Sequence, residues 1–462
     1  MATRDNDNVM TPDKRYREMS RFWPICEALL GGTYAIREAH DEFLPKHPAE
    51  GRDDYAIRVK RSVLTNYYAM TIRHLVGKAF SRPLVLQDDV PLQIQEWCED
   101  IDLQGTHINS FAPSLFFDVL GIGFGAILVD YTRTEPGLSL ADERSIGARP
   151  YMVNVPARNL LGVRTGVRAS DIQMARIKEE FVVPSGLYGE ETRQRVRVLY
   201  PGWYQLHEER RMDNQSSYVV VEEGPMSIGR VPLVPVYGHK DAAWYGSPPL
   251  LDLAYKNVQH YQVDSDYDNA LRVASIPILA ISGYDADRDP SIVIGPQRVL
   301  ATQSEGGRFY YVEHSGSALG AARQRLEDLK ADMATMGLQM LMPKASGAAT
   351  ATETQVRYSE ATSDLQRMAF AFKDSIENAL LLMAEWIGLP DGGSVELRGQ
   401  FTMPRDAAAE AQALIQLRSA GEITSRTLLS ELKRRDFLPD DFDIEGEIEL
   451  LSLEGPSDDF GE

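Results

Sequence analysis

Three long segments of helical periodicity occupy the second half of the chain, and their order constrains the fold more than any single motif. They run over Leu250–Val273, about Leu319–Leu341 and Glu353–Gly388. Pro248 and Pro249 stand immediately before the first segment, and proline suits the first turn of a helix because its missing N–H costs nothing there. At about 1.5 Å per residue, the first helix spans roughly 36 Å and the third exceeds about 50 Å. A helix as long as the third usually crosses a whole domain or kinks.

The segments between these helices differ in composition. About 40 residues separate the first two helices, and the runs Ile276–Ile281, Ile292–Ala301 and Arg308–Val312 are typical of short strands. The sequence MPKASGAATA at Met342–Ala351 is small and Gly-containing, so it predicts a mobile loop. The order therefore predicts an αα-hairpin whose tip carries a small β-subdomain, followed by a loop and a very long helix.

The residues before the hairpin predict a mixture of helices and strands. Apolar spacing predicts helices over 14–40 and 53–80, and another from about Ile108 that runs into the glycines Gly121–Gly125 and the strand Ala126–Tyr131. Between 150 and 240, apolar runs separated by Gly, Pro and charged residues predict an antiparallel sheet. Its expected strands are Tyr151–Val155, Ile172–Ile177, Val196–Leu199, Tyr218–Glu222 and Leu233–Tyr237.

The C-terminal region predicts a strand at Val395–Phe401 and helices at Pro404–Ala420 and Thr424–Asp436. From Pro439 to Glu462 there are ten acidic residues and no Lys or Arg. Such a tail is typical of a solvated or partly disordered end. The whole pattern predicts an α+β fold of two or more substructures, as expected for 462 residues.

The charge balance limits how the chain can use nucleic acid. Formal net charge is −20, from 48 basic and 68 acidic residues. A protein that grips DNA by neutralising phosphates should be basic, so tight, salt-sensitive binding is not expected. Any DNA contact must be local, or the surface must repel DNA. No apolar run approaches the ~18–20 residues of a membrane span, and the polar N-terminus does not resemble a secretory signal.

The glycines Gly121–Gly125 invite a dinucleotide-binding interpretation, but the order of elements excludes it. That fingerprint needs a strand, then glycines, then a helix, whereas here a helix comes first. No Gly-Lys-Ser/Thr follows, so a P-loop is excluded as well. A tight helix-to-strand turn is the better account.

Other chemical motifs are missing from the sequence. The eight histidines show no metal-ligand spacing, and no GxSxG is present. Asp264, Asp266 and Asp268 alternate but lack the Gly and distal Glu of a calcium loop, so we expect a polar helix face. Tyr255, Tyr261 and Tyr267 recur at six-residue steps and are expected to pack against neighbouring helices rather than stack on bases. We expect no enzyme activity, no metal and no cofactor. Cys26 and Cys98 are expected to be buried thiols.

The order of parts resembles the portal proteins of tailed bacteriophages, also called head-to-tail connectors. Arg230–Val236, Leu250–Asn257 and Ser265–Asn269 look like that family's entry into its first stem helix. Ala420–Leu429, followed by an acidic run, is similar to portal C-termini. The resemblance covers essentially the whole chain, and its specificity lies in the joint order of these segments.

The resemblance implies an α/β wing, an antiparallel helical stem, a small β clip, and a long helix under a helical crown. The implied boundaries are 1–246 with a returning strand at 391–403 for the wing, 247–273 and 317–341 for the stem, 274–316 for the clip, 342–352 for the tunnel loop, 353–390 for the long helix, and 404–462 for the crown with its acidic tail.

The resemblance also implies function and partners. Family members form rings, typically of twelve subunits, at one capsid vertex, and double-stranded DNA passes through the ring. Their partners are the major capsid protein, the large terminase subunit and the head–tail adaptor, and they act in the virion after assembly in the host cytoplasm. The implied clip docking residues are Gln297, Arg298, Gln303, Arg308 and Tyr310. The implied DNA-tunnel loop residues are Pro343, Lys344, Ala345, Ser346, Gly347, Ala348, Ala349 and Thr350.

The acidic balance suits this role, because a mostly acidic channel wall leaves weak contacts and low friction for moving DNA. Lys344 is the one charge in the implied loop and is expected to contact phosphates transiently. An ordinary solvated lysine is the alternative. Two other functions stay open: another head–tail connector or minor head protein, and a nucleotide-dependent enzyme built on Gly121–Gly125.

Overall fold

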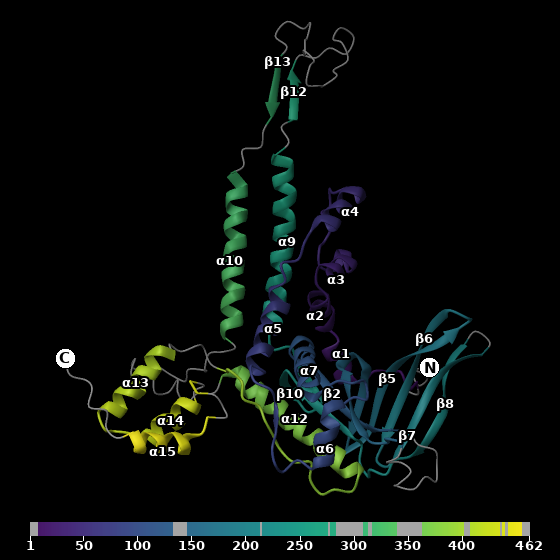
Figure 1. The fold of residues 1–462 in the computed structure, drawn as a ribbon. Coiled ribbons are helices and arrows are strands. Elements are labelled where there is room, and N and C mark those ends of the chain that lie inside the picture. The colour runs from purple at the N-terminus through teal and green to yellow at the C-terminus, as the bar shows by residue number, and fades with distance from the viewer. Residues whose placement is uncertain are drawn as a thin grey trace, which may run out of the picture. The chain divides into compact units, whose positions relative to one another are not determined.

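The chain folds into two compact units, Met1–Phe401 and Thr402–Glu462. The computed structural model describes residues 8–132, 146–212, 215–275, 278–282, 308–312, 317–339, 363–401, 407–434, 437–438 and 442–454. Helices and antiparallel strands both occur, so the predicted α+β class is confirmed. Figure 1 traces the elements of the chain in order.

The first predicted helix, residues 14–40, was wrong, because this stretch contains three helices. Pro24 lies in the first turn of the second, and Gly31 caps its C-terminal end. The apolar spacing continues across these breaks because each short helix buries its own face. The three helices are α1 (Lys14–Met19), α2 (Trp23–Leu30) and α3 (Gly32–Glu38).

The second predicted helix, residues 53–80, also divides. It separates into α4 (Arg52–Arg61) and α5 (Tyr67–Ala79). The Asn66 side chain accepts a hydrogen bond from the Ala69 N–H and thereby caps the start of α5. The next elements are β1 (Val85–Leu86), α6 (Leu92–Trp97), α7 (Ile108–Ile122) and β2 (Phe124–Tyr131). The start of α7 and the bounds of β2 agree with the prediction to within two residues.

A three-stranded antiparallel sheet has β2 at its centre, flanked by β3 (Pro150–Pro156) and β9 (Leu233–Tyr237). The helix α12 (Asp364–Trp386) lies against this sheet. The Trp386 Nε1–H donates to the Val129 carbonyl at 2.9 Å, and the Ser375 hydroxyl donates to the Pro235 carbonyl at 3.2 Å. Two polar contacts therefore hold the helix across the strands.

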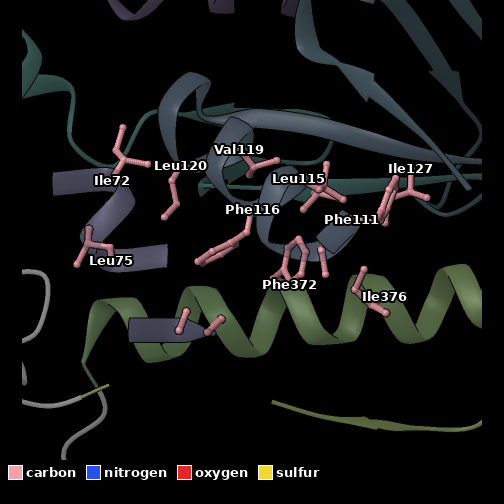
Figure 2. Close-up of a cluster of buried hydrophobic side chains, with 14 of the residues drawn as sticks. Ile72, Leu75, Phe111, Leu115, Phe116, Val119, Leu120, Ile127, Phe372 and Ile376 are labelled. Carbon is pink, nitrogen blue, oxygen red and sulfur yellow. The ribbon is translucent and has the colours of Figure 1, made fainter. Parts of the chain in front are cut away.

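The main hydrophobic core lies among α5, α7 and α12 (Figure 2). The Phe372 ring meets Phe80 and Phe116 edge-to-face, at centroid distances of 5.9 and 5.0 Å. Such aromatic pairs are worth about 0.5–1.5 kcal/mol beyond the area they bury. The apolar face predicted for this helix is confirmed at its buried members, Leu365, Phe372, Ile376, Ala379 and Met383.

A second, five-stranded antiparallel sheet follows the chain in simple consecutive order. The predicted strands 172–177, 196–199 and 218–222 each cover only part of a longer strand of this sheet. Two further strands, 160–165 and 203–212, were not predicted at all. Charged side chains are frequent in the unpredicted residues 178–185, 189–195 and 203–212 and obscure the apolar pattern there, whereas 160–165 is mostly apolar and was overlooked. The strands are β4 (Leu160–Thr165), β5 (Ile172–Ser185), β6 (Gly189–Tyr200), β7 (Trp203–Met212) and β8 (Gln215–Pro225).

Two small two-stranded sheets complete the first unit outside the hairpin. β10 (His239–Ala242) pairs with β11 (Tyr245–Ser247). β1 pairs with β14 (Val395–Glu396), so the predicted returning strand near 395 does return to the early part of the chain. It is shorter than the predicted Val395–Phe401.

The helical hairpin has nearly the predicted bounds. Its helices are α9 (Leu251–Ala274) and α10 (Ser317–Gln339), which run side by side in Figure 1. Between them in sequence, β12 (Ile278–Ser282) pairs antiparallel with β13 (Arg308–Val312). The predicted strand at Ile292–Ala301 lies outside the described residues.

The long helix after the hairpin starts later than predicted. Ser363 has an extended backbone, and its side chain accepts a hydrogen bond from the Gln366 N–H, so it is the N-cap of α12. A single unbroken helix over Glu353–Gly388 was therefore wrong. A serine followed by Asp364 is an ordinary helix start, which the continuing apolar period obscured. Residues 353–362 lie outside the described part of the chain.

The second unit contains α13 (Ala407–Ser419), α14 (Ser425–Arg434) and α15 (Ile444–Glu454). The first two agree with the predicted helices. The acidic tail was expected to be a solvated or partly disordered end, and α15 lies within it. Its Ile444, Ile448 and Leu451 have helical spacing, which the density of carboxylates concealed.

Candidate functional site

The foot of the helical hairpin is fixed to the first unit by buried polar side chains. Asn257 of α9 is fully buried. Its amide nitrogen donates to the Thr65 carbonyl and its amide oxygen accepts from the Tyr68 N–H, both at 2.9 Å. The Gln262 amide likewise donates to the Phe43 carbonyl at 2.9 Å. Because buried amides are costly without partners, these bonds specify one seating of the helix.

A charged cluster joins α9 to α4. The Arg58 guanidinium donates to both carboxylate oxygens of Glu50, at 2.8 and 2.9 Å. Asp266 of α9 lies 3.5 Å from Arg58 and 3.2 Å from the His47 ring. Beside them the Ser62 hydroxyl donates to the Ser265 hydroxyl at 2.7 Å. The guanidinium pairing lowers the pKa of Glu50, so this carboxylate stays ionised near neutrality.

The two helices of the hairpin meet through one apolar face and one ion pair. Leu326, Leu329 and Met333 of α10 are buried. The Lys256 ammonium of α9 lies 3.3 Å from the Asp332 carboxylate of α10. Both charges are partly exposed, so this pair sets alignment more than stability.

His260 of α9 is buried at the same junction, and neither ring nitrogen has a hydrogen-bond partner in the described part of the chain. Its ring lies edge-on to Tyr67, with centroids 5.9 Å apart. Burial lowers the pKa of His260, with the charges of Asp264, Lys330 and Glu327 contributing less. The imidazole is therefore held in its neutral form.

The predicted tight turn at Gly121–Gly125 is confirmed and lies against the start of α9. Gly123 has φ +96° and ends α7. A Cβ there would lie 2.3 Å from the Pro248 nitrogen, so only glycine allows this approach. The glycine thus serves packing of the hairpin foot.

Several residues singled out in the sequence have clear places on α9. Asp264, Asp266 and Asp268 lie within the helix, as predicted. Tyr261 is buried, whereas Tyr255 is 55% exposed, so the packing role predicted for all three tyrosines is wrong for Tyr255. In the described residues of the clip, Arg308 and Tyr310 are exposed on β13, and Tyr310 is 50% exposed.

The remaining expected site residues belong to two segments, 297–303 and 343–350. Gln297, Arg298 and Gln303 of the clip lie outside the described residues, as do all eight tunnel-loop residues from Pro343 to Thr350. Their implied roles stay predictions.

A groove of about 680 Å³ was not foreseen from the sequence. It lies between β10, the start of α9 and the start of α12. Lys240 and Arg367 line it, and the Lys240 ammonium sits 5.2 Å above the Tyr237 ring. Arg367 pairs with Asp364, so the groove is close to neutral rather than strongly basic. Lys240 and Arg367 lie 127 positions apart in the sequence, so no local motif predicts that they line one groove.

The described residues contain no group of three or more His, Cys, Asp or Glu side chains placed to hold a metal. Cys26 and Cys98 are buried and unpaired, and burial raises their pKa values to about 11 and about 12. Such thiols are poor nucleophiles. No described helix is both long and apolar enough to cross a bilayer.

A family described as a domain of unknown function, DUF4055, matches residues 249–387. That span begins at the start of α9 and ends just after α12, so it contains the hairpin and the helix that follows. No curated protein matches the chain.

Solved structures of gene transfer agent (GTA) particles are similar to the chain over most of its length. A chain from the neck of the empty particle, computed with C6 symmetry, is 14% identical with a TM-score of 0.40, covering 80% of this chain and 89% of that one. A chain from the native virion is 14% identical with a TM-score of 0.37, covering 87% and 98%. A chain from the native neck, computed with C12 symmetry, is 14% identical with a TM-score of 0.39, covering 86% and 98%.

Proposed function

We propose that this chain is a structural protein of the head–tail connection of a tailed bacteriophage, and specifically its portal subunit. Copies form a ring, expected to be twelve, at one capsid vertex. Double-stranded DNA enters and leaves through the ring. The ring contacts the major capsid protein, docks the large terminase subunit during packaging, and later holds the head–tail adaptor.

The hairpin is the observation that carries this proposal. α9 and α10 lie side by side, β12 and β13 form a small sheet between them in sequence, and α12 follows after a small-residue segment. This is the order of stem, clip, stem, loop and long helix that the sequence resemblance implies. The buried anchors at Asn257 and Ser265 fix the stem to the wing, as a load-carrying channel wall requires.

The single chain also leaves apolar stem surface uncovered. Tyr255 and Leu271 of α9 are 55% and 41% exposed, and Leu338 of α10 is 45% exposed. Side-by-side copies in a ring supply neighbours for such residues, which a monomer does not. The net charge of −20 keeps DNA from adhering to the ring that it passes.

Particle shape tests the proposal directly. Negative-stain images and native mass spectrometry of the purified full chain should show rings of about a dozen subunits with a central hole. A chain that stays monomeric or dimeric across a range of salt and protein concentrations contradicts it. We also propose that the chain is not an enzyme, so the same preparation should neither bind nor hydrolyse ATP.

The second candidate is another head–tail connector or a minor head protein. Loss of the chain from the phage separates the two candidates. Without a portal, terminase has no docking site and heads stay empty of DNA. Without an outer connector, DNA-filled heads without tails should accumulate instead.

The role of Lys344 is a separate prediction. If the loop contacts phosphates through this ammonium, Lys344→Glu should reduce the amount of DNA packaged and retained per particle, while rings still form. Lys344→Arg keeps the charge and serves as the control. Equal DNA content in all three particles, measured by nuclease-protected DNA, shows that Lys344 is an ordinary solvated lysine.

A further inference from the structure

The outer half of the five-stranded sheet has two open edges. β5 pairs with β4 only over Ile172–Ile177, so no described strand pairs with Lys178–Ser185 on that side. β8 is the last strand of the sheet, and no described strand pairs with its outer edge. Unpaired N–H and C=O groups along such edges are templates for another strand.

The outer edge of β4, in contrast, is covered by the N-terminal residues of the same chain. Along β4, the Leu161 carbonyl accepts from the Asp13 N–H at 2.9 Å. The Val163 carbonyl accepts from the Arg15 guanidinium at 3.3 Å. The fold therefore occupies the edge of β4 with its N-terminal residues and leaves the outer edges of β5 and β8 vacant within the described structure.

Each open edge carries an apolar stretch next to charged residues and a proline, which are Lys178, Glu179, Glu180 and Pro184 on β5 and Glu222, Glu223 and Pro225 on β8. Ser217–Val221 of β8 contains no charged residue and no proline, and Val220 is 43% exposed. Phe181–Val183 of β5 is equally apolar, and Val182 is 56% exposed. A bulge interrupts β8 only at the inner end of this stretch, opposite Leu206 and His207. A strand that pairs with each edge is the usual way to cover such segments.

We propose that β8 of one copy pairs antiparallel with the outer half of β5 of the next copy, so that the sheet continues from subunit to subunit. This inference rests on the proposed ring and names the contact that closes it. Successive strands alternate in direction from β5 to β8, so the next β5 meets β8 in the sense found throughout the sheet. Each copy offers one edge and receives the other, as a head-to-tail ring requires.

The apolar stretches of the two edges match, whereas the charges beside them are mixed. Antiparallel pairing with Phe181–Val183 opposite Tyr218–Val220 sets Lys178 of one copy opposite Glu223 of the other and Glu179 opposite Glu222. Pairing of β8 with β8 instead makes two-fold dimers and leaves the β5 edge open, which does not build a ring.

Paired cysteines test the contact in the assembled full-length ring. Val182→Cys is combined in turn with Tyr218→Cys, Val219→Cys and Val220→Cys, because one residue of register decides which pair is close. Mild oxidation should give a ladder of disulfide-linked multimers on a non-reducing gel for at least one pair. The pair Val167→Cys with Val219→Cys is the matched control, since Val167 is fully exposed in the turn before β5.

Charge insertion is the second measurement. Val182→Lys and Val220→Lys should each raise the unassembled fraction about tenfold or more, because a lysine on an edge opposes strand pairing. Val167→Lys should assemble like the unmodified chain, and circular dichroism checks that each variant is folded. Rings that form normally in both variants and give no ladder overturn the inference but leave the portal proposal standing. Absence of rings from the unmodified chain overturns the portal proposal itself.

Discussion

Arg197 joins the two sheets of the first unit through a single side chain. Its guanidinium lies 2.6 Å from the Asp130 carboxylate of β2 and 2.5 Å from the Glu179 carboxylate of β5. Removing one partner from a buried ion pair leaves charges without compensation and costs about 3–5 kcal/mol. Arg197→Met should lower the free energy of unfolding by about that amount in denaturant titrations. Arg193→Met, which removes an exposed pair with Glu191, should cost about 0–1 kcal/mol.

His260 makes stability depend on pH in a defined direction. Because burial lowers its pKa, the unfolded chain takes up this proton more readily than the folded chain. Well above an ordinary imidazole pKa of about 6.5 the histidine is neutral in both states, and stability falls as pH drops through and below that value. His260→Leu should therefore lose less stability than the unmodified chain between pH 7.5 and 5.5, measured by thermal unfolding. His239→Leu, at an exposed histidine, is the control. Identical pH profiles for His260→Leu and the unmodified chain contradict this account.

At the scale of elements, the approach of the α7–β2 turn to the start of α9 depends on Gly123. Gly123→Ala combines a positive φ with a Cβ 2.3 Å from Pro248, so it should destabilise the fold by about 2 kcal/mol or more. Gly77→Ala in α5 is the matched control, because its Cβ meets nothing within 4 Å and alanine favours helix by about 0.5–1 kcal/mol. Equal stabilities of the two variants in denaturant titrations contradict the structural role of Gly123.

Element boundaries were predictable where local chemistry marks them. Pro248 and Pro249 mark the start of α9. The apolar period of α10 predicted both of its ends to within two residues. Periodicity alone missed the breaks at Gly31 and Asn66, because short helices in series keep their apolar faces inward. The same reasoning missed the N-cap at Ser363. Caps are the local signal that distinguishes one long helix from several short ones.

The sheet and the candidate site were less predictable because they depend on distant residues. β7 carries charged side chains along much of its length and shows no apolar alternation, so only pairing with β6 and β8 identifies it. Asn257 and Arg58 act through partners that lie far from them or in other elements. A polar residue between the apolar positions Ala254 and Val258 was the available sign of a buried amide. The groove lined by Lys240 and Arg367 had no such sign.

At the scale of the whole molecule, the fold combines a firmly anchored hairpin with edges left for neighbours. Asn257 and the Arg58 cluster give the α9–α10 hairpin one orientation on the rest of its own subunit. The open edges of β5 and β8 then supply a repeated contact that needs no change within the subunit. A ring built this way owes its shape to rigid subunits and its closure to backbone pairing.

Net charge sets how such rings should respond to salt. Every copy carries −20, so neighbours in a ring repel one another at low ionic strength. Raising ionic strength from about 0.01 to 0.15 M shortens the Debye length from about 30 to about 8 Å and screens that repulsion. The contacts proposed between copies are mainly backbone hydrogen bonds and apolar side chains, which salt weakens little. The ring fraction in sedimentation velocity should therefore rise with salt at fixed protein concentration. Rings that dissociate as salt rises would show that ion pairs between copies dominate the interface, contrary to the strand pairing proposed for β5 and β8.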